Sequence, residues 1–274
     1  MAANYLPNNL VVLDTKDLSP IKTIDVKDAS GKASRVSAVY NAPPRNSFIA
    51  ALKDLKEVWE IAYDQPELNV RKIKVDDYLD DFFFDQSYQH LIGASRDSKD
   101  GQVIDLDLGK KIKTIDLAGM PHLGSGITWD YKGRKVMATP NLKDGQVSVI
   151  DMTTWEVIKR IDTKGPGFFM RSHKNSKYAW VDVFFGPNRD LMHVINKETL
   201  EIEKTLQPIP GKTAAHIEFT KDGSHALMSI WDEDGALIVY DANTLKEIKR
   251  LPMKKPSGKY NVHNKTTYAT GTSH

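Results

Sequence analysis

The chain has 274 residues, a formal net charge of +2 from 38 basic and 36 acidic residues, and no cysteine. This near balance of charge gives no reason to expect a nucleic-acid or membrane partner. The lack of cysteine excludes disulfides, thiolate metal sites, covalently attached c-type haem and cysteine nucleophiles. No apolar run approaches the ~20 residues that a membrane-spanning helix needs.

The dominant pattern of the sequence is a repeated hairpin. Within Val147–Asp162, a β-branched run ends at Asp151, a short polar loop follows, and a second run with Val157, Ile158 and Ile161 restarts a strand. β-Branched residues favour strands, and an aspartate at the junction can start a turn by bonding to its own backbone. The pattern predicts a β-hairpin.

Copies of this hairpin recur along the chain at a nearly constant spacing. Successive anchor residues, aligned on Asp151, are separated by 50, 41, 46, 45 and 45 residues. A period of roughly 40–50 residues that contains only strand patterns is typical of a β-propeller blade. The anchors, in chain order, are Asp14, Asp64, Asp105, Asp151, Asn196 and Asp241.

Five of the six repeats also contain two strand patterns ahead of the hairpin. Their turns carry pairs such as Lys132-Gly133 and Asp222-Gly223, which suit tight hairpins. The sequence therefore predicts five complete four-stranded blades. The expected inner strands are 37–40 and 48–52, 82–85 and 90–94, 126–129 and 135–139, 168–171 and 178–183, and 217–219 and 226–231.

The two ends of the chain are expected to be half-blades. Asn9–Asp25 supplies two outer strands, and Gly258–Lys265 and Tyr268–His274 have the pattern of two inner strands. We therefore predict an all-β fold in which residues 1–274 form a single β-propeller domain. The two halves either pair to close a six-bladed ring or belong to a longer propeller.

The first candidate functional segment is Pro121–Gly126, between an outer strand and the next inner strand. In a propeller, loops and inner strands converge around the central channel. His122 is a candidate metal ligand or proton donor. Gly124 and Gly126 allow close backbone approach to a ligand or a positive φ. An ordinary glycine-rich turn is the alternative interpretation.

Equivalent segments follow in the next two blades. Arg171, which ends Gly165–Arg171, can pair with a ligand carboxylate, and the preceding Phe168 and Phe169 are interpreted as core packing. His216 precedes an inner strand, where a channel-facing and a buried structural histidine are equally plausible. Trp231 offers a rigid face for a flat ligand. His173 and His225 lie in predicted turns, so we expect both at the surface.

Several stretches together resemble the haem d1 domain of the cytochrome cd1 nitrite reductase family. Within that group the chain is most similar to the NirF-type haem d1 biosynthesis proteins. The resemblance implies an eight-bladed propeller of which this chain covers about six blades. It is carried by Pro121–Trp129, Gly165–His173, His216–Gly223, Ala226–Trp231, Lys255–Val262 and Gly271–His274.

The chain departs from the reductase pattern at three positions. The two distal histidines that protonate nitrite in the family would fall near Pro43 and Phe84, and neither residue is histidine. Without these general acids nitrite reduction is disfavoured. Ser125 stands where relatives commonly have arginine, which removes one partner for the carboxylates of haem d1.

The resemblance implies a periplasmic protein that binds haem d1 or its precursor and acts in haem d1 maturation for denitrification. The expected partners are a tetrapyrrole and, further, nitrite reductase or other maturation proteins. The alternatives are a non-catalytic propeller scaffold and the d1 domain of a nitrite reductase. In the maturation interpretation His122 and His216 contact the tetrapyrrole or act as acid and base. The expected cofactor-binding residues are Gly124, Gly126, Arg171, Trp231, Tyr260 and Asn261.

Overall fold

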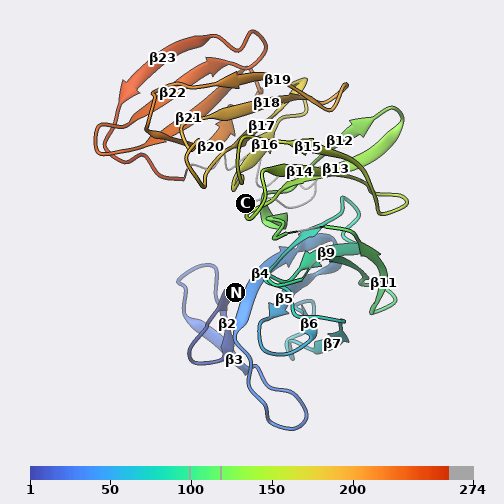
Figure 1. The fold of residues 1–274 in the computed structure, drawn as a ribbon. Helices are drawn as coiled ribbons and strands as arrows, with labels where there is room; N and C mark the ends of the chain where they lie inside the picture. The colour runs from blue at the N-terminus through green and yellow to red at the C-terminus, as the bar shows by residue number, and fades with distance from the viewer. Residues whose placement is uncertain (99, 118, 259–274) are drawn as a thin grey trace. The chain divides into compact units, whose positions relative to one another are not determined.

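The protein is an all-β propeller of antiparallel, four-stranded blades, seen here in a computed structural model that describes residues 1–258 except 99 and 118. The described residues form one three-stranded and five four-stranded sheets, in which strands lie side by side in chain order (Figure 1). The chain divides into two compact units, Met1–Ile115 and a second that begins at Asp116. Among the described residues, no helix has the length and apolar character needed to span a bilayer.

The first unit contains three sheets. A 3-10 turn, η1 (Pro43–Arg45), joins the first two strands of its second sheet. The strands are β1 (Ala2–Ala3), β2 (Asn9–Leu13) and β3 (Pro20–Asp25); β4 (Val36–Ala42), β5 (Ser47–Leu52), β6 (Glu57–Ala62) and β7 (Val70–Lys74); and β8 (Asp81–Phe84), β9 (His90–Ala94), β10 (Gly101–Asp105) and β11 (Lys110–Ile115).

The second unit contains three further four-stranded sheets. A 3-10 turn, η2 (Leu123–Ser125), precedes the first of them. The strands are β12 (Ile127–Tyr131), β13 (Arg134–Pro140), β14 (Gln146–Asp151) and β15 (Glu156–Asp162); β16 (Met170–Ser172), β17 (Tyr178–Asp182), β18 (Met192–Asn196) and β19 (Glu201–Leu206); and β20 (Thr213–Phe219), β21 (His225–Trp231), β22 (Ala236–Asp241) and β23 (Glu247–Pro252).

The anchor residue closes each regular outer hairpin with its own backbone and side chain. In β14–β15, the carbonyl of Asp151 accepts the N–H of Trp155 at 2.8 Å, and its Oδ1 accepts from Thr153 and Thr154. A register shift precedes the anchor, between Val149 and Ile150. This local closure explains why aspartate or asparagine recurs at the anchor positions.

The residue four places after each anchor adopts the left-handed conformation, and only Gly109 among the six is glycine. Leucine or tryptophan is found at the other five positions. Trp155, Leu200 and Leu245 have φ near 58–59° and are at most 7% exposed. Left-handed backbone costs an L-residue roughly 1–2 kcal/mol. Burial of the large side chain against the blade offsets that cost.

Buried apolar side chains fill the space between neighbouring sheets of the same unit. In the second unit, Trp180 of β17 packs with Phe219 of β20 and Met228 of β21. In the first unit, Ile49 and Ile73 pack with Phe82 across the next sheet boundary. The outermost strands are exposed: all six residues of β23 are accessible to solvent.

The five predicted four-stranded blades are confirmed, and most strand ends lie within two residues of the prediction. β1 was not predicted, because two alanines carry no strand pattern. β16 begins at Met170, two residues after the predicted start at Phe168. The reason is that the N–H groups of Phe168 and Phe169 donate to the side chain of Asp182. Both predicted C-terminal strands lie outside the described residues, apart from Gly258.

Candidate functional site

An aromatic cluster in the second unit contains both candidate histidines. Its members come from the loop before β12, the loop before β16, the loop after β17, the middle of β20 and the end of β21. Most are half-buried, so their rings are partly accessible. We call this group the aromatic cluster; it comprises His122, Phe168, Phe169, Phe184, Phe185, His216 and Trp231.

His122 is held by the backbone on both sides of its ring. Its N–H donates to the carbonyl of Pro140 at 2.9 Å. Its ring stacks on Phe168 with centroids 4.3 Å apart and an interplanar angle of 19°. Nδ1 lies 2.5 Å from the Phe168 carbonyl oxygen. Because a carbonyl only accepts, Nδ1 carries a proton, and in the neutral form of the ring the lone pair lies on Nε2.

His216 occupies a bulge within strand β20. Its φ is 56°, and the register with β21 shifts between Ala215 and Glu218. Bulges of this kind redirect a side chain away from the regular alternation of a strand. The residue is 2% exposed, and its ring lies against Phe169 with centroids 4.1 Å apart. A Cβ added at Gly258 would lie only 2.8 Å from Nε2, so glycine allows this close approach.

Asp182 at the end of β17 binds the backbone that carries the cluster. Its Oδ1 accepts the N–H groups of Phe168 at 2.7 Å and Phe169 at 3.0 Å. The backbone N–H of His216 also faces this carboxylate and favours its charged form. The side chain is fully buried, and burial raises the pKa of Asp182 to about 7, against the effect of these N–H groups.

Arg171 lies in β16 and is 6% exposed. Its Nε is 3.8 Å from Glu218 Oε2 in β20, and another guanidinium nitrogen donates to the Met170 carbonyl. Glu218 is itself buried and accepts the N–H of Phe219. The pair joins the innermost strands of two successive blades, and Glu218 competes with any ligand carboxylate for the guanidinium.

The glycine-rich segment forms the 3-10 turn η2. Gly124 and Ser125 are buried within it, and Gly126 ends it with φ −61° and ψ 145°, a conformation open to any residue. Gly126 therefore does not have the positive φ that was one of its two expected roles. The other expected role, close backbone approach to a ligand, depends only on the small size of glycine. The Ser125 hydroxyl is buried and makes no hydrogen bond among the described residues.

Trp231 ends β21 at the edge of the cluster. Its ring meets that of Phe184 edge to face, with centroids 5.3 Å apart. Its indole Nε1 is buried and, like the Ser125 hydroxyl, has no hydrogen-bond partner in the described part of the chain. Tyr260 and Asn261 lie outside the described residues.

The structure thus brings His122, His216 and Trp231 into one cluster through the intervening phenylalanines. Phe168 and Phe169, interpreted from sequence as core packing, are instead half-buried and contact the two imidazoles. Sequence reasoning missed Asp182, although a lone aspartate in the apolar run Tyr178–Phe185 was a usable signal. The expectation of a surface position was wrong for His173, which is 9% exposed.

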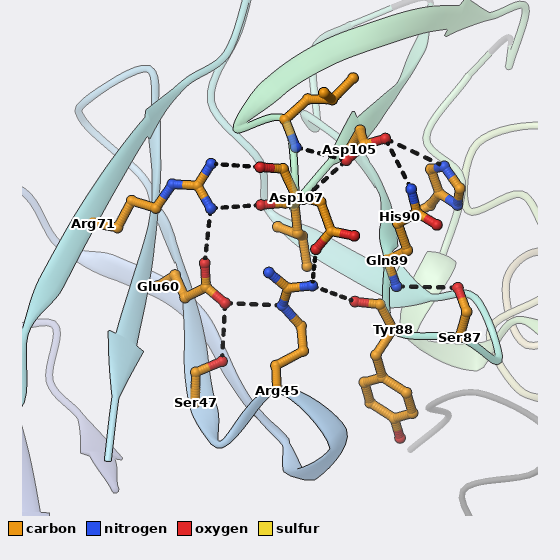
Figure 2. Close-up of polar contacts among 12 residues, drawn as sticks. Arg45, Ser47, Glu60, Arg71, Ser87, Tyr88, Gln89, His90, Asp105 and Asp107 are labelled. Carbon is orange, nitrogen blue, oxygen red and sulfur yellow. Dashed lines mark hydrogen bonds and ion pairs between the residues drawn. The ribbon is translucent and has the colours of Figure 1, made fainter. Parts of the chain in front are cut away.

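The first unit contains a network of polar side chains that bond to one another and to nearby backbone carbonyls (Figure 2). Glu60 accepts from Arg45 Nε at 2.8 Å and from Ser47 Oγ at 3.1 Å. Arg71 donates to the carbonyls of Leu106 and Asp107. Among the described residues no cluster of histidine and carboxylate side chains is suited to a metal ion. This network ties neighbouring sheets together.

The repeated sheets define a β-propeller, and the histidine–aromatic cluster is the candidate site of its second unit. The sequence model of the family described as "Cytochrome D1 heme domain" matches residues 1–265, so the chain belongs to that family. This confirms the resemblance drawn from the residues. The predicted similarity to NirF-type proteins is also confirmed, and a stronger match to a different relative is found beside it.

The chain is 57% identical over 275 residues to a protein named dihydro-heme d1 dehydrogenase from Pseudomonas aeruginosa, covering all of this chain and 56% of the relative. Protein NirF of the same organism is 29% identical, with 95% of this chain and 68% of the relative covered. The solved structure of dihydro-heme d1 dehydrogenase NirN in complex with DHE aligns with a TM-score of 0.92 over 96% of this chain and 56% of that one. The chain therefore spans about half the length of the relative it matches best among these.

Proposed function

We propose that this chain binds haem d1 or its dihydro precursor and acts at a late step of haem d1 biosynthesis. The observation that carries the proposal is the 57% identity, over the whole chain, to a dihydro-heme d1 dehydrogenase. The relationship to protein NirF supports the same assignment to cofactor maturation. At this identity a shared fold is expected throughout, and the site residues decide whether function is shared too.

The residues of the aromatic cluster fit a tetrapyrrole. Its rings offer faces for stacking against a flat macrocycle. The buried Ser125 hydroxyl and Trp231 Nε1 have no hydrogen-bond partner among the described residues, and a ligand with several carboxylates supplies acceptors for both. His122, His216 and Trp231 are the contacts we propose, with the backbone at Gly124 and Gly126 admitting a substituent. Arg171, Tyr260 and Asn261 remain proposed binding residues.

The chemistry we propose for this chain's residues is proton transfer. Dehydrogenation of a dihydro-tetrapyrrole removes two protons and two electrons, so the electrons would have to pass to an electron acceptor outside this chain, and the bound tetrapyrrole would supply the redox-active centre. The lone pair on Nε2 of His122 suits it to accept a proton. His216, in the bulge of β20, is the proposed second acid–base group.

Nitrite reduction is a weaker candidate for this chain. The positions near Pro43 and Phe84, where the reductases place proton-donating histidines, hold a proline and a buried phenylalanine. A non-catalytic scaffold is the other alternative, and the departure at Ser125 favours it. We further propose a periplasmic location, with nitrite reductase or another maturation protein as partner, by analogy with the relatives' roles.

Titration of the purified chain with haem d1 and with dihydro-haem d1, followed by visible spectra, tests this proposal. We expect a shift of the Soret band with a Kd in the micromolar range or below. His122→Ala and His216→Ala should each raise the Kd at least tenfold, about 1.4 kcal/mol. His225→Ala is the matched control, because that side chain bonds to Ser224 in the turn between β20 and β21.

Two outcomes would count against the proposal. If neither tetrapyrrole shifts its spectrum at micromolar protein, the scaffold alternative is favoured. If the ligand binds but both alanine variants retain wild-type affinity, the site lies elsewhere in the fold.

A further inference from the structure

We propose that Asp182 is a positioning residue for the candidate site, which sets the relative placement of the two imidazoles through the backbone of Phe168, Phe169 and His216. The inference rests on the proposed function, because it gives that site a residue that acts through backbone groups. It concerns a side chain that no sequence motif indicated. Three observations carry it: the bonds that the carboxylate makes, the path from each bond to an imidazole, and its complete burial.

The first observation is the pair of bonds at one oxygen. Oδ1 of Asp182 accepts two successive N–H groups, those of Phe168 and Phe169, at 2.7 and 3.0 Å. Successive N–H groups in a strand point to opposite sides, so one acceptor can reach both only if the segment leaves the strand ladder. The late start of β16 shows that it does.

The second observation is that each imidazole is linked to this carboxylate through the backbone of a single residue. The carbonyl of Phe168, whose N–H is bound by Asp182, is the partner of His122 Nδ1. On the other side, the N–H of His216 faces the same carboxylate. The ring of His216 packs on Phe169, whose N–H also donates to Asp182. One buried group thus binds the backbone of the two segments that carry Phe168, Phe169 and His216.

The third observation is the cost of keeping a carboxylate there. Asp182 is 0% exposed, and its second oxygen makes no hydrogen bond of normal geometry among the described residues. Burial of a carboxylate is expensive, and a hydrophobic residue would pack the end of β17 at lower cost. A group retained at such cost is expected to serve the site rather than stability.

The groups shown to face the carboxyl from neighbouring elements are the backbone N–H groups of Phe168, Phe169 and His216, and His122 is reached through the Phe168 carbonyl. A protonated carboxyl would turn one acceptor oxygen into a donor among donors. Protonation of Asp182 is therefore expected to loosen the backbone of Phe168 and Phe169, and ionisation of Asp182 to hold it in place.

The test uses the intact chain and two independent readouts. In protein labelled with ¹⁵N-phenylalanine and ¹⁵N-histidine, the amide signals of Phe168, Phe169 and His216 should move together between pH 5.5 and 8.5, with one midpoint near 7. In Asp182→Asn this shared transition should be lost. The same variant should bind dihydro-haem d1 about tenfold more weakly, because asparagine offers one acceptor oxygen, not two, to the three N–H groups that face this side chain.

Asp151→Asn is the matched control. That aspartate is also buried and accepts two backbone N–H groups, but it closes an outer hairpin, where Asn196 shows that asparagine is tolerated. It should leave both the affinity and the shared transition unchanged. An Asp182→Asn variant that loses the transition but keeps wild-type affinity would show a structural role only.

The wild-type titration stands on its own if Asp182→Asn does not fold. Three amides without a common midpoint would overturn the inference whatever the ligand does. Conversely, a wild-type chain that shows the transition but binds neither tetrapyrrole would contradict the proposed function and leave the positioning geometry intact.

Discussion

The imidazole of His122 and the backbone of Phe168 form a closed unit: the two rings stack 4.3 Å apart while Nδ1 lies 2.5 Å from the carbonyl oxygen of the same residue. The hydrogen bond places a proton on Nδ1, and together with the stacked ring it orients the histidine. In the proposed mechanism, Nδ1 of His122 therefore holds the ring in place and Nε2 accepts the proton.

Substitution of His122 by asparagine and by glutamine tests whether Nε2 accepts the proton. The amide nitrogen of asparagine can approach the position of Nδ1 and keep the bond to the Phe168 carbonyl, whereas glutamine can approach the position of Nε2. If Nε2 accepts the proton, both variants should bind dihydro-haem d1 within about fivefold of wild type, and both should lose turnover by ~100-fold or more. If His122→Asn lost binding while His122→Gln kept it, the group at the Nε2 position would be needed for affinity.

His193 should make the chain less stable in acid. It is 1% exposed, Nε2 accepts the N–H of Lys164, and Nδ1 donates to Thr205. Burial lowers the pKa of His193 to about 4, with Lys164 adding to the shift. The unfolded chain therefore binds more protons between pH 6.5 and 4, so stability falls as the pH falls through that window.

The measurement is urea unfolding of wild type and His193→Gln at several pH values. Glutamine stays neutral, so the stability of wild type relative to this variant should drop by about 2–3 kcal/mol from pH 7 to pH 4. A difference that stays constant with pH would contradict a neutral, buried imidazole.

Asp182 should have the opposite effect on stability. Burial raises the pKa of its carboxyl to about 7, so the folded chain binds the additional proton between about pH 4 and 7. Its contribution to stability is fully present below pH 4 and is lost as the pH rises through 7. The melting temperature of Asp182→Asn, relative to wild type, should therefore rise from pH 5 to pH 8. A relative melting temperature that falls over this range would show that ionisation stabilises the fold.

Leu200 tests the strain at the hairpin ends. It has φ 58° and is 3% exposed, so it combines an unfavourable backbone with a buried side chain. Leu200→Ala loses the packing and keeps the strain, at a cost of about 2–5 kcal/mol. Leu200→Gly loses the packing but relieves the strain, so it should be about 1 kcal/mol more stable than the alanine variant.

Leu206 provides the control for this pair. It is also buried but lies in the regular strand β19. There the order should reverse, with alanine more stable than glycine. The same order at both positions in urea unfolding would show that positive φ carries no strain at Leu200.

Glu60 should be the critical member of the ionic network in Figure 2. Its side chain is 11% exposed and faces Arg45, which is 16% exposed, whereas Asp107 is 59% exposed. Glu60→Ala leaves a nearly buried guanidinium without its main partner and should destabilise by about 3 kcal/mol. Asp107→Ala should cost less than about 1 kcal/mol. Thermal unfolding of both variants measures the difference, and equal effects would contradict the ranking by burial.

The outer hairpins were predictable because their structure is local. The anchor side chain, its turn and the following strand lie within a few residues, so one aligned pattern specified each copy. The unusual residue at the hairpin ends was not anticipated, since leucine and tryptophan at positions such as Leu200 and Trp155 read as ordinary strand residues. Their conformation follows from the bond that closes the turn, which sequence alone does not show.

The candidate site was only partly predictable. The segments that interrupt the repeat indicated His122 and His216 as candidates, and the structure joins these two residues through Phe168 and Phe169. The role of Asp182 was not foreseen, because it depends on bonds between residues 13 and 14 positions apart. The burial of His173 was missed for a similar reason: an added Cβ at Gly223, fifty residues later, would collide with its ring.

The outer hairpins and the aromatic cluster differ in the length of chain that each contact must close. The bond that ends the Asp151 hairpin joins residues four apart, while the contact between His122 and Phe168 joins residues 46 apart. The entropy lost on closing a loop grows with its length. The outer hairpins can therefore form as independent local structures, and the aromatic cluster can form only after neighbouring blades have docked. A spectrum of bound tetrapyrrole would accordingly report the completed fold, not its parts.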